Sequence, residues 1–231
     1  MKNIQLVIFD CDGVLVDSEY LAARIEAKLL TDAGFPIDAQ TMTERFSGLT
    51  FKDTLLQIEQ ESDVPLSASL LTQVDRLIDL ALETELVAVE GAERTLRRIK
   101  LPKCICSNSS SDRLGISLGR TGLYRLFEPH IFAAHEVGTK KGKPDPNVFL
   151  FAAKRFNAAP QATVVIEDSV HGATAAVRAG MRVIGFTGGM HTYPGHGDQL
   201  IEAGAETVVA RFADIPGVIE AFDVWAGPDA A

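Results

Sequence analysis

Six short runs of apolar residues recur along the chain, and each ends in polar or glycine-rich sequence. They lie at residues 4–9, 103–106, 130–133, 163–166, 182–186 and 207–210. The runs are almost continuously apolar, which is typical of strands that a parallel sheet buries on both faces. Segments with a helical pattern separate most of them, at residues 90–99, 112–120, 145–156 and 169–179. This alternation predicts an α/β fold with a doubly wound, Rossmann-like parallel sheet.

One long segment breaks the alternation. Between the first and second runs there is no convincing strand pattern, and helical patterns lie at residues 20–33, 51–61 and 67–85. In the last of these, apolar residues follow i, i+3, i+4 spacing. We therefore predict an all-helical cap domain at residues 17–86, inserted into a catalytic core formed by residues 1–16 and 87–231. The alternative is an elaborated crossover within a single domain.

Composition and charge narrow the function classes. The chain has 231 residues, of which 46% are hydrophobic and 23% charged, so it is long enough for a sizeable core. Its 22 Lys and Arg against 31 Asp and Glu give a net charge of −9, which disfavours nucleic acid as a partner. No apolar run is long enough for a membrane span or a signal peptide. We expect a cytoplasmic protein that is a monomer or weak homodimer, with its three cysteines as buried thiols.

The ends of the predicted strands carry the candidate chemistry, since ligands of open parallel sheets bind beyond the carboxyl ends of the strands. Polar side chains follow the first four runs: Asp10, Asp12, Ser107, Asn108, Lys143, Glu167 and Asp168. Crowded carboxylates repel one another unless a cation offsets their charge, and a small set of oxygen ligands suits Mg²⁺. With a lysine and a hydroxyl group, such a cation forms a site for a phosphoryl group.

The spacing of Asp10 and Asp12 has its own logic. Side chains two residues apart on an extended chain point the same way. Asp10 is placed to act as a nucleophile, and Asp12 to protonate a leaving oxygen and then deprotonate water. Each motif taken alone is also typical of a turn, a helix cap or a group of solvated charges. We expect Lys140 and Lys141 to be solvated charges of this kind. Their joint occurrence at successive strand ends carries the inference.

Four motifs, in order, resemble those of the haloacid dehalogenase (HAD) superfamily. They are FDCDGVLVDSE at residues 9–19, Ser107 in CSNSS, Lys143 in KGKPDP, and Glu167 and Asp168 in IEDS. The resemblance covers nearly the whole chain and includes a helical cap after the first motif. Within the superfamily the chain resembles β-phosphoglucomutases and, through ELVAVEGAERTL at residues 85–96, sugar-phosphate phosphatases of the 6-phosphogluconate type.

The resemblance implies a role for each motif residue. Asp10 would form an aspartyl-phosphate intermediate, and Asp12 would be the general acid and base. Lys143 would position Asp10 and neutralise charge, while Ser107 and Asn108 would hold the phosphate. Mg²⁺ would be bound by Asp10, by the backbone carbonyl of Asp12, by Asp168, and by Glu167 directly or through water.

Selectivity for the substrate is expected to come from the cap, which closes over the leaving group. Lys52 is our candidate for contacting a substrate anion, and Glu19 is a second cap contributor. Where mutases carry a cap histidine and two cations, this chain has Tyr20 or Leu21, and Ser47 and Phe51. This favours hydrolysis of a small phosphorylated metabolite, a sugar phosphate. The alternatives are a phosphomutase and a non-hydrolytic phosphoaspartate switch or metabolite-binding protein.

Four further residues near the motifs have weaker signals. Cys11 is expected to point into the core, away from the two acids. His171 is expected on a helix surface, with a role near the site as the alternative. His191 and His196 lie in a glycine-rich segment, GGMHTYPGHGD, which is interpreted as a loop at the rim of the site; their spacing is a poor metal signature.

Overall fold

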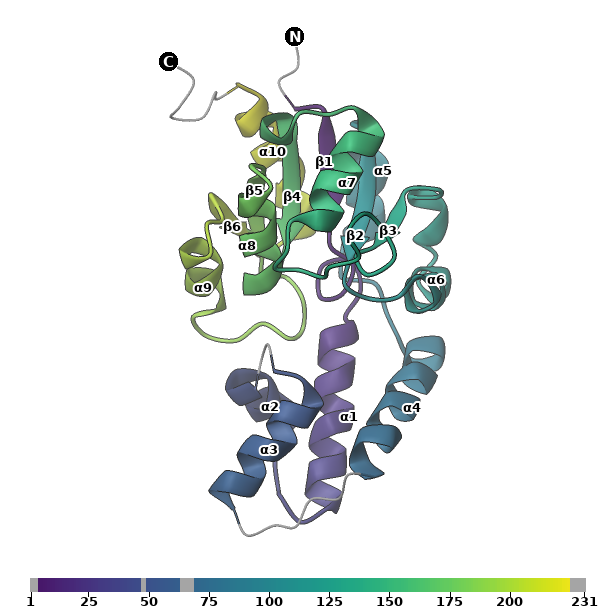
Figure 1. Ribbon diagram of the computed structural model, residues 1–231, viewed down its shortest axis with the longest axis vertical. Helices are drawn as coiled ribbons and strands as arrows, with labels where there is room; N and C mark the ends of the chain where they lie inside the picture. Colours follow the sequence, from purple (N-terminus) through teal and green to yellow (C-terminus); the bar gives the residue numbers. More distant parts are fainter. Residues whose placement is uncertain (1–3, 47–48, 63–68, 225–231) are drawn as a thin grey trace.

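In the computed structural model, which describes residues 4–46, 49–62 and 69–224, a sheet covered by helices on both faces stands above a group of helices (Figure 1). The sheet has six parallel strands in the order β3-β2-β1-β4-β5-β6. Their bounds are β1 Leu6–Phe9, β2 Lys103–Ser107, β3 Ile131–Ala133, β4 Thr163–Glu167, β5 Arg182–Phe186 and β6 Thr207–Val209. The predicted doubly wound α/β fold is confirmed, and every predicted run forms a strand.

The strand order fixes where a ligand binds. The chain builds outward from β1 through β2 to β3, then returns to the other side of β1 and builds outward through β4, β5 and β6. The order therefore reverses at β1, and the carboxyl ends of β1, β2 and β4 lie side by side. A crevice at such a switch point is where open α/β sheets bind their ligands.

Successive side chains of each strand point to opposite faces of the sheet, and each face has its own hydrophobic cluster. In β1, Val7 and Phe9 belong to one cluster, and Leu6 and Ile8 belong to the other. The first face is covered by α5 (Ala92–Arg98), α6 (Ser111–Arg120) and α10 (Ile215–Val224). The second is covered by α7 (Asn147–Phe156), α8 (Val170–Arg178) and α9 (His196–Glu202). Short 3-10 turns lie at Tyr124–Leu126, Pro160–Ala162 and Phe212–Asp214.

The remaining helices form the lower part of the molecule in Figure 1. They are α1 (Ser18–Asp32), α2 (Ala39–Phe46), α3 (Phe51–Glu61) and α4 (Ser69–Thr84). These helices enclose a third hydrophobic cluster that includes Leu30, Ile58 and Val74. We call α1 to α4 the cap helices. No helix in the described ranges combines the length and the apolar character that crossing a bilayer requires.

Two connections join the cap helices to the sheet, and they run side by side. The backbone N–H of Asp17 donates to the carbonyl of Val87 at 3.1 Å, and that of Val89 donates to the carbonyl of Leu15 at 3.0 Å. These paired connections contain the predicted domain boundaries, after residues 16 and 86. The division into two domains at those positions stays a prediction.

Local signals placed most helices correctly. Ser169 caps α8 by accepting a hydrogen bond from the backbone N–H of Gly172, and Gly180 follows that helix with φ of +74°. Three helices were missed. Helix α9 begins within the segment interpreted as a loop, α2 has only eight residues, and α10 has Pro and Gly in its first turn. Such short or Gly- and Pro-containing segments carry too little periodic signal to be predicted.

Candidate active site

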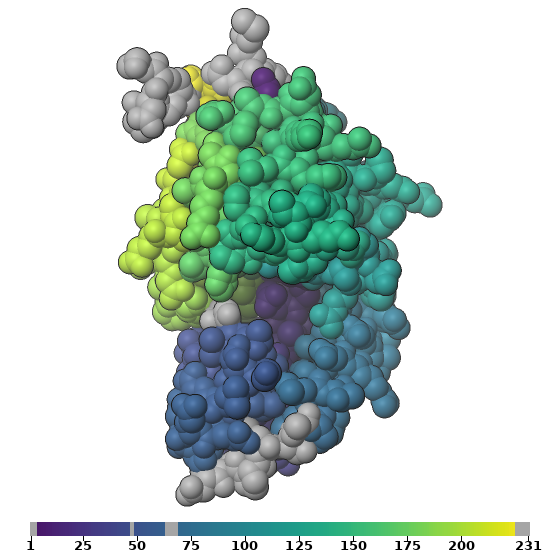
Figure 2. Space-filling view, viewed as in Figure 1, coloured from purple at the N-terminus to yellow at the C-terminus, as the bar shows by residue number. Residues whose placement is uncertain are grey.

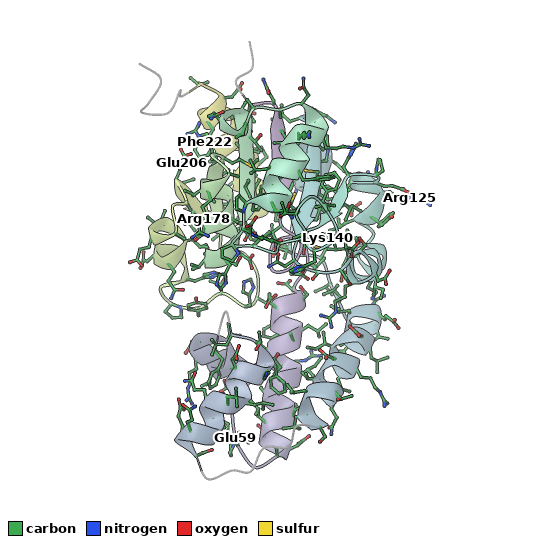
Figure 3. The ribbon with its side chains drawn as sticks, viewed as in Figure 1. Glu59, Arg125, Lys140, Arg178, Glu206 and Phe222 are labelled. Atoms are coloured by element: carbon green, nitrogen blue, oxygen red, sulfur yellow. The ribbon has the colours of Figure 1, made fainter. Side chains whose placement is uncertain are left out.

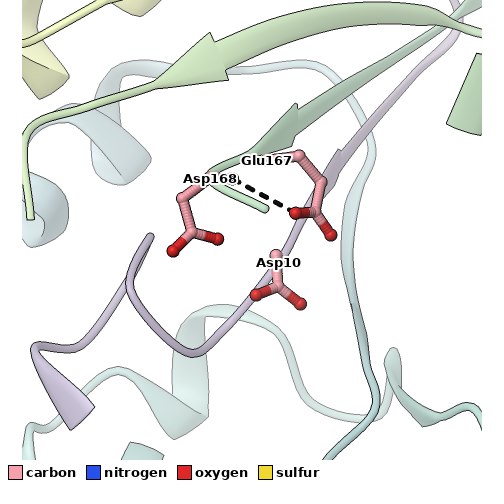
Figure 4. A group of neighbouring side chains, drawn as sticks. All are labelled: Asp10, Glu167 and Asp168. Atoms are coloured by element: carbon pink, nitrogen blue, oxygen red, sulfur yellow. Dashed lines mark hydrogen bonds between the residues drawn. The ribbon is translucent and has the colours of Figure 1, made fainter. Parts of the chain in front are cut away.

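Three carboxylates meet at the sheet edge where β1 and β4 end (Figure 4). Asp10 follows β1, Glu167 is the last residue of β4, and Asp168 comes next. All three side chains are buried, and one carboxylate oxygen of each lies within 4.8 Å of the others. Register explains the meeting, because Phe9 pairs with Ile166 and the residues after each pair therefore emerge together.

One buried ammonium group serves this cluster. Lys143 Nζ donates to Asp10 Oδ1 at 2.6 Å and to Glu167 Oε1, and it lies 5.1 Å from the ring centre of Phe149. Burial alone lowers the pKa of this lysine, but the adjacent carboxylates of Asp10 and Glu167 outweigh it and raise the pKa above its ordinary value. Lys143 is therefore a fixed positive charge. Lys140 and Lys141 are exposed, as expected.

The negative charge at this edge exceeds what one lysine offsets. Burial, followed by the charges of neighbouring acids, raises the pKa of Asp10 and Asp168 well above the ordinary value, although Lys143 opposes the shift. A divalent cation among these oxygens would restore the ionised forms. The donor set is all oxygen and limited to a few carboxylates, which fits Mg²⁺ with its retained waters better than a nitrogen- or sulfur-seeking metal.

Asp12 lies just beyond this cluster, held by hydroxyl groups. Its Oδ1 accepts from Ser18 Oγ at 2.7 Å, and its Oδ2 accepts from Ser109 Oγ at 2.7 Å and from Ser107 Oγ at 3.2 Å. These hydrogen bonds fix the carboxylate over the cavity. Cys11 between the two acids is fully buried in the hydrophobic cluster, as predicted.

The loop after β2 is tied to the loop that carries Lys143. Asn108 Oδ1 accepts from the backbone N–H of Lys143 at 2.8 Å, and Asn108 Nδ2 donates to the backbone carbonyl of Lys143 at 3.3 Å. The backbone N–H of Ser109 donates to Ser107 Oγ at 2.9 Å. The hydroxyl groups and N–H groups of residues 107–110 thus stand beside Lys143, an arrangement suited to an anion.

Gly13 allows a close approach of the backbone to Asp168 and His191. Its φ is +74°, a conformation that side chains rarely adopt. A Cβ atom at this position would overlap the Asp168 carboxylate and come within 2.7 Å of His191 Cε1. Only glycine therefore lets the turn after Asp12 pass beneath Asp168.

Two histidines reach the site more closely than the sequence indicated. His191 Nε2 lies 2.8 Å from Asp168 Oδ2, and His196 Nε2 lies 2.6 Å from the Asp168 carbonyl oxygen. Burial lowers the pKa of both, which favours the neutral rings, and the tautomer with its proton on Nε2 is the one that donates to Asp168. Their Nδ1 atoms have no hydrogen-bond partner among the described residues. The sequence signal for these histidines was their position in the glycine-rich segment that follows β5. That signal did not show that α9 begins at His196.

A cavity of about 750 Å³ opens between the sheet edge and the cap helices. Figure 2 shows the hollow there, with purple atoms from the first part of the chain visible between the cap helices and the core. Of the predicted site residues, Asp10, Asp12, Ser107, Asn108, Lys143 and Asp168 line it. Glu167 is fully buried beneath them. Glu19 and the exposed His171 also line the cavity, but Lys52 is exposed on α3 and is not part of its wall.

A second cavity of about 90 Å³ lies between α1 and α2 and shares Glu19, Leu49 and His191 with the first. Glu19 and Glu26 both contribute to its wall. Desolvation, followed by the charges of Asp12 and Asp168, raises the pKa of Glu19 to about 7. Desolvation, followed by the charge of Glu19, raises the pKa of Glu26 to about 7.

The comparisons with known proteins agree with this geometry. The model of the haloacid dehalogenase-like hydrolase family matches residues 4–180. The 6-phosphogluconate phosphatase of Escherichia coli (strain K12) is 31% identical over 195 residues, covering 84% of this chain and 87% of that protein. The resemblance inferred from the four motifs is confirmed.

Two solved structures are similar over almost the whole chain. A conserved haloacid dehalogenase-like protein of unknown function from Agrobacterium tumefaciens str. C58 is 53% identical, with a TM-score of 0.91, covering 94% of this chain and 98% of that one. A HAD family hydrolase from Deinococcus radiodurans R1, solved with bound phosphate and sodium, is 31% identical, with a TM-score of 0.86 and coverages of 98% and 99%.

Replacing Gly13 by Ala tests the close approach at the turn. We expect the free energy of unfolding to fall by about 1–3 kcal/mol, because alanine is strained at this φ and its Cβ displaces Asp168. Urea unfolding followed by circular dichroism measures this change. Gly115→Ala is the matched control, since it lies in α6 with open space around its Cβ, and we expect it to be neutral or stabilising. Equal stability of Gly13→Ala and the wild type would contradict the analysis.

The raised pKa of Glu26 has a consequence for stability. Between its ordinary value of 4.5 and about 7, the unfolded chain releases the Glu26 proton while the folded protein keeps it. The free energy of unfolding therefore falls as pH rises through this window. We expect Glu26→Gln to be more stable relative to the wild type at pH 8 than at pH 5, by about 1–2 kcal/mol after allowance for partial exposure. Urea unfolding at both pH values tests this, and no pH dependence of the difference would contradict it.

Proposed function

The chain belongs to the haloacid dehalogenase-like hydrolase family, and we propose that it is a Mg²⁺-dependent phosphatase that hydrolyses a small phosphorylated metabolite, a sugar phosphate, through an aspartyl-phosphate intermediate. One observation carries the proposal. At a single sheet edge, Asp10 lies hydrogen-bonded to Lys143, while Asp12 stands over the same cavity among serine hydroxyl groups. The phosphatase name of the Escherichia coli relative and the phosphate bound in the Deinococcus radiodurans structure support the same reading.

The first half of the proposed reaction transfers the phosphoryl group to the protein. An Asp10 carboxylate oxygen attacks phosphorus, and the bond from phosphorus to the leaving oxygen breaks. Asp12 gives its proton to that oxygen, so the product leaves as a neutral alcohol. Lys143 and the hydroxyl and N–H groups of the loop after β2 balance the charge on the phosphoryl oxygens.

The second half returns the protein to its starting state. Asp12, now ionised, removes a proton from a water molecule, and the water oxygen attacks phosphorus. The bond between phosphorus and Asp10 breaks, which releases inorganic phosphate and restores both side chains. Asp12 is thus acid in one half and base in the other, and its three hydroxyl partners keep it oriented through both.

The proposed Mg²⁺ site uses the three carboxylates of Figure 4. Asp10 and Asp168 would bind the ion, Glu167 directly or through water, and the backbone carbonyl of Asp12 would complete the protein ligands. When bound, the ion would supply charge stabilisation for the phosphoryl group and hold Asp10 ionised. His191 contacts Asp168, and Lys143 contacts Glu167; these contacts fix the orientation of the two carboxylates.

Hydrolysis is favoured over a phosphomutase. At the positions where mutases carry cap cations and a histidine, Leu21 is buried in the hydrophobic cluster and Phe51 packs against the cap cluster. Ser47 lies outside the described residues. A phosphoaspartate switch is disfavoured by Asp12, because a long-lived phosphoaspartate needs no base beside it.

The same proposal covers partners and location. The acidic charge and acid-lined cavity support a small phosphorylated metabolite and not nucleic acid as the partner. A cytoplasmic location, the absence of a membrane partner, and a monomeric or weakly dimeric state stay predictions. Lys52 as a contact to the substrate also stays a prediction.

Metal dependence is the first test of the proposal. We expect inorganic phosphate to be released from one or a few members of a sugar-phosphate panel with Mg²⁺ present, and activity to fall by at least about 10²-fold with excess EDTA. Adding Mg²⁺ back is expected to restore the rate. Full activity in EDTA would contradict the metal-dependent mechanism.

The two acids are tested separately. We expect Asp10→Asn to lower kcat by about 10³-fold or more and Asp12→Asn by about 10²–10⁴-fold, because one removes the nucleophile and the other the proton donor. Asp75→Asn, an exposed position on α4, is the control and should retain wild-type kcat. Acid-quenched wild-type protein should carry a phosphoryl group on the peptide containing Asp10. Its absence during active turnover would exclude the aspartyl-phosphate route.

A further inference from the structure

We propose that the leaving group of the substrate is a neutral polyol, and that the cap helices reject substrates with a second anionic group. This inference rests on the proposed phosphatase function and names its substrate class. Glu19 and Glu26 carry it, because they line a small cavity between the cap helices that adjoins the phosphoryl-transfer cavity.

The two cavities adjoin, and we call the space they occupy together the path. Glu19, Leu49 and His191 belong to the walls of both. The small cavity, about 90 Å³, has room for roughly three water molecules, and therefore for the far end of a short sugar chain. A leaving group that projects from the Asp10 side toward α1 would pass Glu19 and end near Glu26.

Both carboxylates face this path from the same helix. Glu19 and Glu26 are seven residues apart on α1, so they lie on one face about 10 Å apart along the axis. Small residues, Ala22 and Ala23, line the wall between them. Neither carboxylate has a hydrogen bond or ion pair with any residue that the structure describes.

The Lys and Arg side chains that line the path form ion pairs with acids of the protein. The small cavity contains no Lys or Arg among its described wall residues. In the large cavity, Lys143 is paired with Asp10 and Glu167, and Arg113 is paired with Asp79 of α4 at 2.8 Å. The side facing the leaving group therefore presents acid without a compensating charge.

The chemistry of the wall suits hydroxyl groups. An ionised carboxylate only accepts hydrogen bonds, and sugar hydroxyls are donors. His191, only 7% exposed, forms part of both walls. Met42, Phe46 and Leu49 supply apolar surface for the C–H groups of a polyol. A carboxylate or second phosphate at the same place would meet like charge, with no Lys or Arg among the described wall residues of the small cavity to receive it.

A matched pair of substrates tests this. Glucitol 6-phosphate and 6-phosphogluconate differ at one end, where a neutral CH₂OH replaces a carboxylate. At pH 8, where groups with a pKa of about 7 are mostly ionised, we expect kcat/KM for glucitol 6-phosphate to be higher by at least about tenfold. Both compounds are also measured as competitors of p-nitrophenyl phosphate hydrolysis, so that slow turnover of either still gives a ratio.

Variants of Glu19 and Glu26 test whether these two carboxylates cause the preference for glucitol 6-phosphate. We expect the ratio to fall below about threefold in Glu19→Gln/Glu26→Gln, with intermediate ratios in the single variants, which guard against misfolding of the double variant. Glu59→Gln is the control for loss of one cap charge. Glu59 is exposed at the end of α3 far from the core (Figure 3), and its variant should keep the wild-type ratio.

The outcomes separate the two proposals. A ratio near one with an active enzyme, a preference for 6-phosphogluconate, or an unchanged ratio in the double variant would overturn this inference and leave the phosphatase function standing. No hydrolysis of p-nitrophenyl phosphate with Mg²⁺ present would overturn the proposed function, and this inference with it.

Discussion

Three buried carboxylates share one buried ammonium group, and this imbalance of charge governs the site. Asp10 and Glu167 both accept hydrogen bonds from Lys143, while Asp168 contacts His191, whose pKa burial lowers. Removing this many acids from water is unfavourable unless further positive charge compensates. The site is thus built for a ligand that brings cations with it, and a phosphoryl group with a divalent ion meets that need.

The fold makes this arrangement rigid. Asp10 and Glu167 are adjacent to paired residues of β1 and β4, the central strands of the sheet, and the side chains before them are fully buried. Backbone hydrogen bonds from Asp168 and Ser169, both at 3.1 Å, hold Glu167 Oε2 in place. A site carried on such a framework keeps its geometry while the loops and helices above it vary.

The cap helices add a second group of acidic side chains, Glu19 and Glu26 of α1. The leaving-group side is acidic, whereas the phosphate side is served by Lys143 and backbone N–H groups. A substrate with one charged and one neutral end is oriented by this asymmetry, because its phosphate is attracted to one side and repelled from the other. In the proposed function, chemistry and selectivity therefore reside in separate elements, the strand ends and α1.

The sequence by itself determined the strands, most of the helices around them and the motif residues, because continuous apolar runs and polar strand ends are local signals. The pairing and register of β1 against β4, which bring Asp10 and Glu167 together, were decided by the tertiary structure. Only the tertiary structure decided that His191 and His196 contact Asp168, that Lys52 lies off the cavity wall, and that Glu26 faces a second cavity. These contacts join segments far apart in the chain, and nothing in a local pattern encodes how the cap helices lie over the sheet.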